Sequence, residues 1–118
     1  MIGRIKDNDM GWFCELYSVL ASFADEPSNV ISRIGGGRIS IPDDLANHLG
    51  HFRACVLQTY PDAASLELMK VVTEIDAILD NRSLGGEAFE KSFWTNGGFI
   101  RHPDWVRIRS LAREYLIR

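Results

Sequence analysis

The sequence is poor in cysteine and proline and has no long apolar run. Its 118 residues include 2 Cys and 4 Pro. Small secreted domains that depend on disulfides usually have more cysteines, so Cys14 and Cys55 are predicted to be reduced thiols. No apolar run approaches the roughly 18 residues of a membrane span, and the N-terminal segment MIGRIKDNDMGW lacks the apolar stretch of a secretory signal. These absences predict a cytoplasmic protein without membrane contact.

Catalytic and phosphate-binding motifs are also missing. The glycines at 35–37 lie between Arg33 and Arg38, but no Lys-Ser/Thr pair follows them as in a P-loop. Cys55 has His51 one helical turn away, yet no oxyanion-hole motif accompanies them. The sequence therefore predicts a Gly-rich connector, no catalytic residue and no cofactor.

Helical periodicity runs through most of the chain. Apolar residues recur at spacings of three and four, as in Leu45, Leu49, Phe52 and Val56, which is typical of an amphipathic helix. Pro27 is expected to end the first helix, and residues 29–41 to form a connector with one short helical turn near Val30. The prediction is a single all-α domain over residues 1–118, a compact bundle of about five helices, at Met10–Asp25, Pro42–Gln58, Pro61–Asp80, Glu87–Trp94 and Pro103–Arg118.

Two glycines and three tryptophans add local expectations. Asn96-Gly97-Gly98 is expected to end the Glu87–Trp94 helix, because glycine adopts left-handed backbone geometry without steric cost. The tryptophans are expected to pack in the core, with the Phe93-Trp94 pair partly exposed.

One pattern has the residue types of a metal site. Asp44, His48, His51 and Cys55 fall within about 60° of one another along one side of a helix. Such side chains are legitimate zinc ligands, but one straight helix seldom closes a tetrahedral site alone. No metal is predicted, and a metal protein or enzyme that uses His48, His51 and Cys55 is kept as an alternative.

Charge is distributed unevenly. Residues 1–81 hold 12 acids and 6 bases, a balance of −6, whereas residues 82–118 hold 4 acids and 7 bases, a balance of +3. An acidic body argues against nucleic acid as the main partner and fits a basic protein, since complementary fields speed association. The predicted partner-binding residues are Asp43, Asp44, Asp62, Glu67, Glu74, Asp76 and Asp80.

Within residues 62–81 the balance is 5 acids to 1 base, and a merely solvated helix usually mixes the signs. A nucleic-acid-binding adaptor remains the other alternative. It would use the C-terminal arginines, Arg101, Arg107, Arg109 and Arg113.

The C-terminal third resembles small bacterial immunity proteins, the antidotes encoded beside contact-dependent growth inhibition and other polymorphic toxins. The residues that carry this resemblance are Phe93-Trp94-Thr95, Gly98-Phe99, His102-Pro103-Asp104-Trp105, Ile108-Arg109 and Ala112-Arg113. The resemblance implies a cytoplasmic inhibitor that binds the C-terminal nuclease domain of a cognate toxin and blocks its active site. It does not say which toxin is neutralised.

Overall fold

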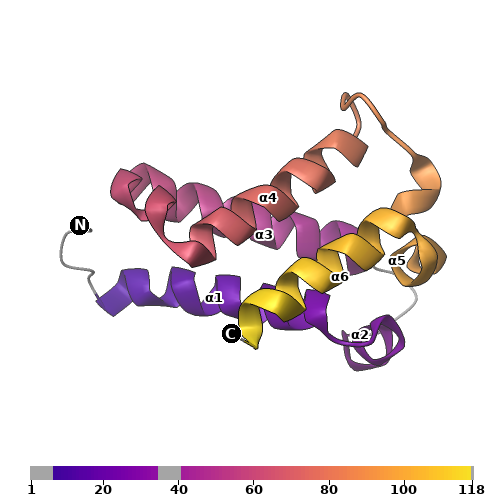
Figure 1. Cartoon of the computed structure of the whole chain (residues 1–118), viewed down its shortest axis with the longest axis horizontal. Helices are drawn as coiled ribbons and strands as arrows, with labels where there is room; N and C mark the ends of the chain where they lie inside the picture. The colour runs from indigo at the N-terminus through magenta and orange to yellow at the C-terminus, as the bar shows by residue number, and fades with distance from the viewer. Residues whose placement is uncertain (1–6, 35–40, 118) are drawn as a thin grey trace.

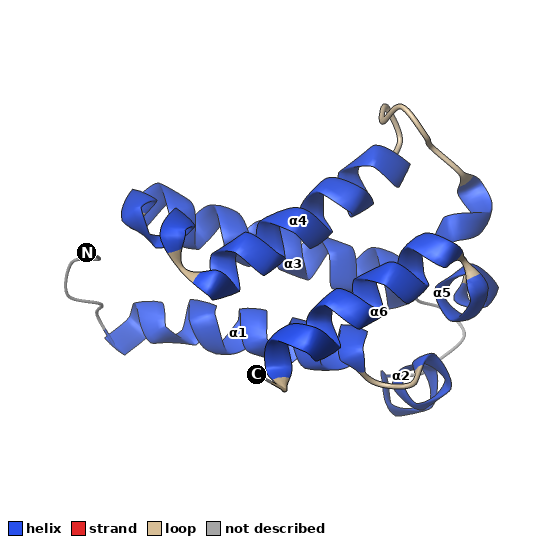
Figure 2. Ribbon diagram, viewed as in Figure 1, coloured by secondary structure: helices blue, strands red, loops and turns tan. Residues whose placement is uncertain are grey.

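The computed structural model describes residues 7–34 and 41–117, and these ranges contain helices without any strand (Figure 2). The predicted all-α bundle is therefore confirmed. None of the described helices is long and apolar enough to cross a membrane. The elements in chain order are α1 (Asp7–Ala24), α2 (Pro27–Ile34), α3 (Ile41–Thr59), η1 (Pro61–Ser65), α4 (Glu67–Arg82), η2 (Lys91–Trp94), α5 (Asn96–Arg101) and α6 (Pro103–Leu116), where η denotes a 3-10 helix.

Four long helices form the body of the molecule. α1 packs against α3 and α6, and α4 packs against the same two helices (Figure 1). The shorter α2 and α5 lie together at one end of the bundle. The predicted apolar stripes face this interior: Leu16, Leu49, Val72 and Ile75, one or more from each of three long helices, are all fully buried. Burial of these stripes provides most of the driving force for folding.

An aromatic cluster around Trp105 joins α6 to the segment before α5. The Trp105 ring stacks on Phe93 with centroids 4.7 Å apart, and its Nε1 donates to the Phe93 carbonyl oxygen at 2.8 Å. Phe99 and Phe23 contact the same indole at centroid distances of 5.0 and 5.7 Å. Phe93 is completely buried, so the expected exposure of the Phe93-Trp94 pair is wrong for Phe93, and only Trp94 is half-buried.

The first correction concerns residues 27–34, which form a full α-helix where the sequence predicted a connector. Pro27 does end α1, but it also begins α2, where its fixed φ and missing N–H suit the first helical position. The Glu26 carbonyl oxygen accepts from the amides of Asn29 and Val30 at 3.0 and 3.2 Å. Burial of Val30 holds the helix on the core. Ile41 is the first residue of α3, and the glycines at 35–37 lie outside the described residues.

The second correction divides the predicted Pro61–Asp80 helix at Leu66, whose φ of −70° and ψ of 143° are extended. The last turn of η1, which precedes Leu66, is closed by the Leu66 amide, which donates to the Ala63 carbonyl oxygen at 2.9 Å. Ala63 is fully buried, so the short turn is packed into the core. Asp62 therefore belongs to a different element from the acids of α4.

The third correction concerns the segment from 87 to 98. Only Lys91–Trp94 is helical within the predicted Glu87–Trp94 helix, and Asn96-Gly97-Gly98 begins α5 where the sequence predicted a helix end. Thr95 caps α5, accepting from the Gly98 amide on its Oγ1 at 2.9 Å. A Cβ at Gly98 would collide with the carbonyl oxygens of Ser92 and Phe93. Glycine is required here for close approach, and among the described glycines only Gly85 has a positive φ, of 91°.

Candidate functional site

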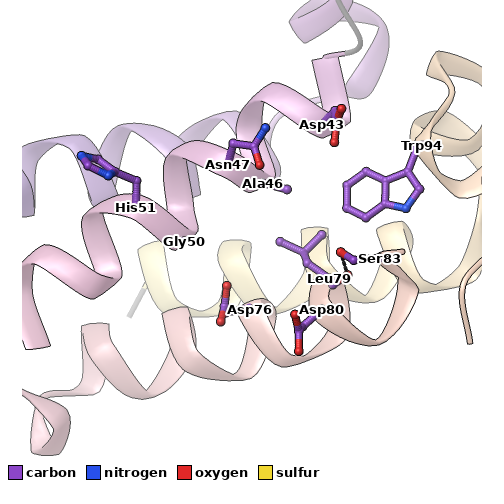
Figure 3. A pocket seen from close by; sticks show the side chains of 10 residues that line it. All are labelled: Asp43, Ala46, Asn47, Gly50, His51, Asp76, Leu79, Asp80, Ser83 and Trp94. Atoms are coloured by element: carbon purple, nitrogen blue, oxygen red, sulfur yellow. Dashed lines mark hydrogen bonds between the residues drawn. The ribbon is translucent and has the colours of Figure 1, made fainter. Parts of the chain in front are cut away.

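Three of the predicted partner-binding acids meet at one groove between α3 and α4. Asp43 comes from the first turn of α3, and Asp76 and Asp80 come from α4 (Figure 3). His51 and Trp94 lie at opposite ends of the groove in this view. The groove has a volume of about 320 Å3 and is lined by Asp43, Ala46, Asn47, Gly50, His51, Asp76, Leu79, Asp80, Ser83 and Trp94.

Small residues on α3 open this groove. Ala46 and Gly50 are one helical turn apart, so they share a face of α3, the face that lines the groove opposite Asp76 and Leu79. A Cβ built at Gly50 would lie 3.7 Å from Asp76 Oδ1, at ordinary contact distance. Larger side chains at these two positions would fill the space between the helices. The groove is thus a consequence of residue size on one face of α3.

The groove carries negative charge that the chain compensates only in part. Arg53 Nη1 lies 3.7 Å from Asp76 Oδ2, and its Nε donates to Thr73 Oγ1 at 3.1 Å. Burial raises the pKa of Asp76, Arg53 opposes that increase, and the neighbouring Asp80 carboxylate adds to it. Asp43 and Asp80 form no ion pair with any described residue. These two exposed carboxylates are therefore available to a cationic partner.

The structure does not bring the other four predicted acids to this groove. Asp44 lines a separate cavity between α1 and α3. Glu67 lies 3.5 Å from Lys70, and Glu74 lies 3.5 Å from Arg107 of α6. Asp62 is exposed on η1. The acids of α4 are also less isolated than the sequence indicated, because bases on α3 and α6 reach Asp76 and Glu74.

An apolar extension of the groove was missed by the sequence analysis. A second cavity, also of about 320 Å3, shares Asp43, Ser83 and Trp94 with the groove and adds Leu84, Phe89 and Lys91. Leu84 is 86% exposed and Phe89 is 47% exposed. A leucine among turn-forming residues, which no core stripe accounts for, was the signal available in the sequence. We call the union of both cavities the acidic–apolar groove.

A network of hydrogen bonds and ion pairs fixes the loop of residues 83–90, which carries the exposed side chains of Leu84 and Phe89. Arg82 Nε donates to Asp104 Oδ2 at 2.7 Å, and its Nη1 donates to the Ala88 carbonyl oxygen at 3.2 Å and lies 3.5 Å from Glu90 Oε1. His102 Nε2 lies 3.1 Å from Glu90 Oε2, and the His102 Nδ1 accepts from the Asp104 amide at 3.1 Å. The two ends of the loop are therefore tied to α4 and α6.

The backbone of the same loop is also bonded to the end of α4. The Ala88 amide donates to the Asn81 carbonyl oxygen at 3.0 Å, and the Gly86 amide donates to the Ser83 carbonyl oxygen at 2.8 Å. A Cβ at Gly86 would collide with backbone oxygens of α4. The positive φ of Gly85 completes the turn. Leu84 and Phe89 are thus presented on a backbone that is already ordered.

The His and Cys residues of α3 do not converge. Cys55 Sγ lies 3.8 Å from His51 Nε2, whereas His48 Nε2 faces α1, 3.7 Å from Glu15 Oε2. Within residues 7–34 and 41–117, no three His, Cys, Asp or Glu side chains are placed to hold one metal ion. Asp44, at the start of the stripe, is more than two helical turns from Cys55.

Most of the C-terminal arginines make contacts within the chain that stabilise the fold. Arg107 pairs with Glu74, and Arg109 Nη2 donates to the Phe99 carbonyl oxygen at 3.0 Å. Burial lowers the pKa of Arg109. The positive charge of Arg113 lowers this pKa further, and the carboxylate of Glu26 raises it. Arg113 donates to the Ala24 carbonyl oxygen and lies 3.1 Å from Glu26.

Arg101 is exposed and, of the four arginines, is the one that forms no such contact with the described chain.

Comparison of the chain with protein-family models, curated proteins and solved structures gives no match.

Proposed function

We propose that this chain is an immunity protein that binds a basic toxin domain through the acidic–apolar groove and blocks the toxin's active site. The single observation that carries the proposal is the convergence of Asp43, Asp76 and Asp80 on one groove, with two of the three carboxylates unpaired within the described chain. Enzymes that cleave nucleic acid bind phosphates with Lys and Arg, and a surface of carboxylates complements such a cleft.

Several further features favour a protein partner. The groove adjoins exposed apolar side chains, and buried apolar anchors with a charged rim are typical of protein interfaces. Nucleic acid would be repelled by the three carboxylates. The arginines that would serve it instead are mostly engaged within the fold.

The functional test is co-expression with the toxin domain encoded beside this chain's gene. We expect the chain to restore growth and to form a complex with that domain whose affinity falls as salt is raised. Absence of a neighbouring toxin gene, or growth arrest that the chain does not relieve, would contradict the proposal.

A matched pair of double variants tests the site itself. Asp43→Asn with Asp80→Asn removes two charges at the groove, whereas Asp44→Asn with Asp62→Asn removes two exposed charges elsewhere and gives the same net charge. We expect the groove variant to weaken toxin binding at least about tenfold and the control variant to change it little. Equal losses in the two variants would show that only net charge matters.

A further inference from the structure

We infer that Leu84, Phe89 and Trp94 form an anchor pocket for an apolar side chain of the partner, flanked there by arginine or lysine. This inference rests on the proposed function and assigns the chemistry of the segment that the groove binds. The occupant is an amphipathic basic segment of the partner protein. Its apolar side chain enters the cavity beside Trp94, and its cations reach Asp43 and Asp80.

Exposure of the apolar side chains is the first observation. Leu84 is 86% exposed, and neither Leu84 nor Phe89 belongs to the buried core of the described chain. Both face the same cavity as Trp94, which is half-buried and whose Nε1 is occupied by the Arg82 carbonyl oxygen at 2.8 Å. Because the indole nitrogen is already hydrogen-bonded within the chain, this wall of the cavity interacts with a ligand through apolar contact.

Order of the loop is the second observation. A flexible loop would lose conformational entropy on binding, whereas one already bonded to α4 and α6 loses little. Arg82 provides two of those links, through Ala88 and Glu90, and also joins α4 to α6 through Asp104. The chain thus holds two apolar side chains in solvent on a constrained backbone, an arrangement that suits a binding surface better than a connection between helices.

Charge complementarity selects the occupant. The cavity that contains Leu84 and Phe89 shares Asp43 with the adjoining cavity between α3 and α4. Asp80 lines that adjoining cavity. Lys91 lines the cavity that contains Leu84 and Phe89 but not the one that contains Asp76 and Asp80, and its positive charge disfavours cations near it. A partner segment therefore fits with its apolar side chain toward Phe89 and Lys91 and its basic residues toward α3 and α4. A purely apolar segment would leave both carboxylates without partners.

The experiment compares two short synthetic peptides of equal length and charge. One alternates arginine with serine, and the other has a central serine replaced by leucine. Binding of each to the full chain is measured by isothermal titration calorimetry, with NMR chemical shifts to locate the contact. We expect the leucine peptide to bind about tenfold more tightly, because burial of its leucine side chain in the cavity is favourable. The shifts should map to residues 84–94.

Matched variants separate the two parts of the surface. Leu84→Ser and Phe89→Ser should each remove most of the leucine advantage while leaving the serine peptide unchanged. Ile117→Ser and Val106→Ser, at positions 83% and 47% exposed and outside both cavities, should preserve it. An advantage that survives Leu84→Ser and Phe89→Ser overturns the anchor pocket.

The acidic part of the acidic–apolar groove is tested independently of the anchor pocket. Asp43→Asn with Asp80→Asn should weaken both peptides by the same factor, and Asp44→Asn with Asp62→Asn should not. If the two double variants behave alike, or if neither peptide binds, the proposed groove is wrong. If only the leucine advantage is missing, the groove stands and the anchor pocket is wrong.

Discussion

Arg82 Nε lies 2.7 Å from Asp104 Oδ2, and this contact joins the last residue of α4 to the first turn of α6. The two residues are 22 positions apart in the sequence. The ion pair therefore closes the segment that contains the 83–90 loop, η2 and α5. The loop lies beside the groove, since the two cavities share Asp43, Ser83 and Trp94.

Replacement of Arg82 by Met is expected to destabilise the chain by about 2 kcal/mol, because it removes charge-assisted hydrogen bonds and leaves a partly buried carboxylate at Asp104. Urea unfolding measures this change. Arg101→Met, at an exposed position, is the control and should have little effect. Amide hydrogen exchange in residues 83–90 should accelerate only in the Arg82 variant. Unchanged exchange there would contradict the role of Arg82 in ordering the loop.

Gly98→Ala is expected to destabilise the chain by about 1–3 kcal/mol, because its Cβ would collide with the carbonyl oxygens of Ser92 and Phe93. Gly97→Ala is the matched control. Its Cβ would meet nothing nearer than Thr95 Oγ1 at 3.8 Å, and alanine favours the helix, so it should be neutral or slightly stabilising. Thermal unfolding followed by circular dichroism separates the two. Similar melting temperatures would disprove the close approach.

Trp105→Ala is expected to cost about 3–5 kcal/mol of unfolding free energy, because it empties the centre of the aromatic cluster and removes the hydrogen bond to Phe93. Val106→Ala, at the neighbouring exposed position, should change stability by less than about 1 kcal/mol. Chemical denaturation of both variants gives the comparison. A small loss at Trp105 would mean that the cluster repacks around the space.

The stability of the chain is expected to depend on pH through Asp76. Burial raises the pKa of Asp76 in the folded chain, so its contribution to stability is present while the carboxyl is protonated and is lost as pH rises through that pKa. Asp76→Asn removes this dependence. Its unfolding free energy should therefore rise relative to that of the unsubstituted chain as pH rises above about 4, the ordinary range of an aspartate carboxyl.

Urea unfolding across a pH series tests this expectation for Asp76, with Asp62→Asn as a control for charge removal at an exposed position. A difference between Asp76→Asn and the unsubstituted chain that stays constant with pH would show that Arg53 offsets the effect of burial, and a difference that changes in the opposite direction would show that Arg53 outweighs it.

The helices were predictable where apolar periodicity is long, as for Leu49 and Val56 of α3 and for Val72 and Ile75 of α4, all of which are buried. Periodicity failed in the short elements. α2 has eight residues and η2 has four, too few for a repeating stripe, and their stability comes from tertiary burial of Val30 and Phe93.

The candidate site was predictable only in part, for a related reason. Asp76 and Asp80 are four residues apart, so spacing along one helix places them on a common edge, but it does not report which neighbouring helix faces that edge. The meeting with Asp43, and the pairing of Glu74 with Arg107, depend on helix packing. Leu84 was missed because a single apolar residue in a loop has no periodicity at all.

The contacts that shape the 83–90 loop involve Arg82, Glu90, backbone amides and carbonyl oxygens, and two glycines, but neither the Leu84 nor the Phe89 side chain. Those two positions are therefore free to vary in size and polarity while the backbone keeps its path. Under the proposed function, exchange of these two outward-facing residues would change the target without redesign of the interior.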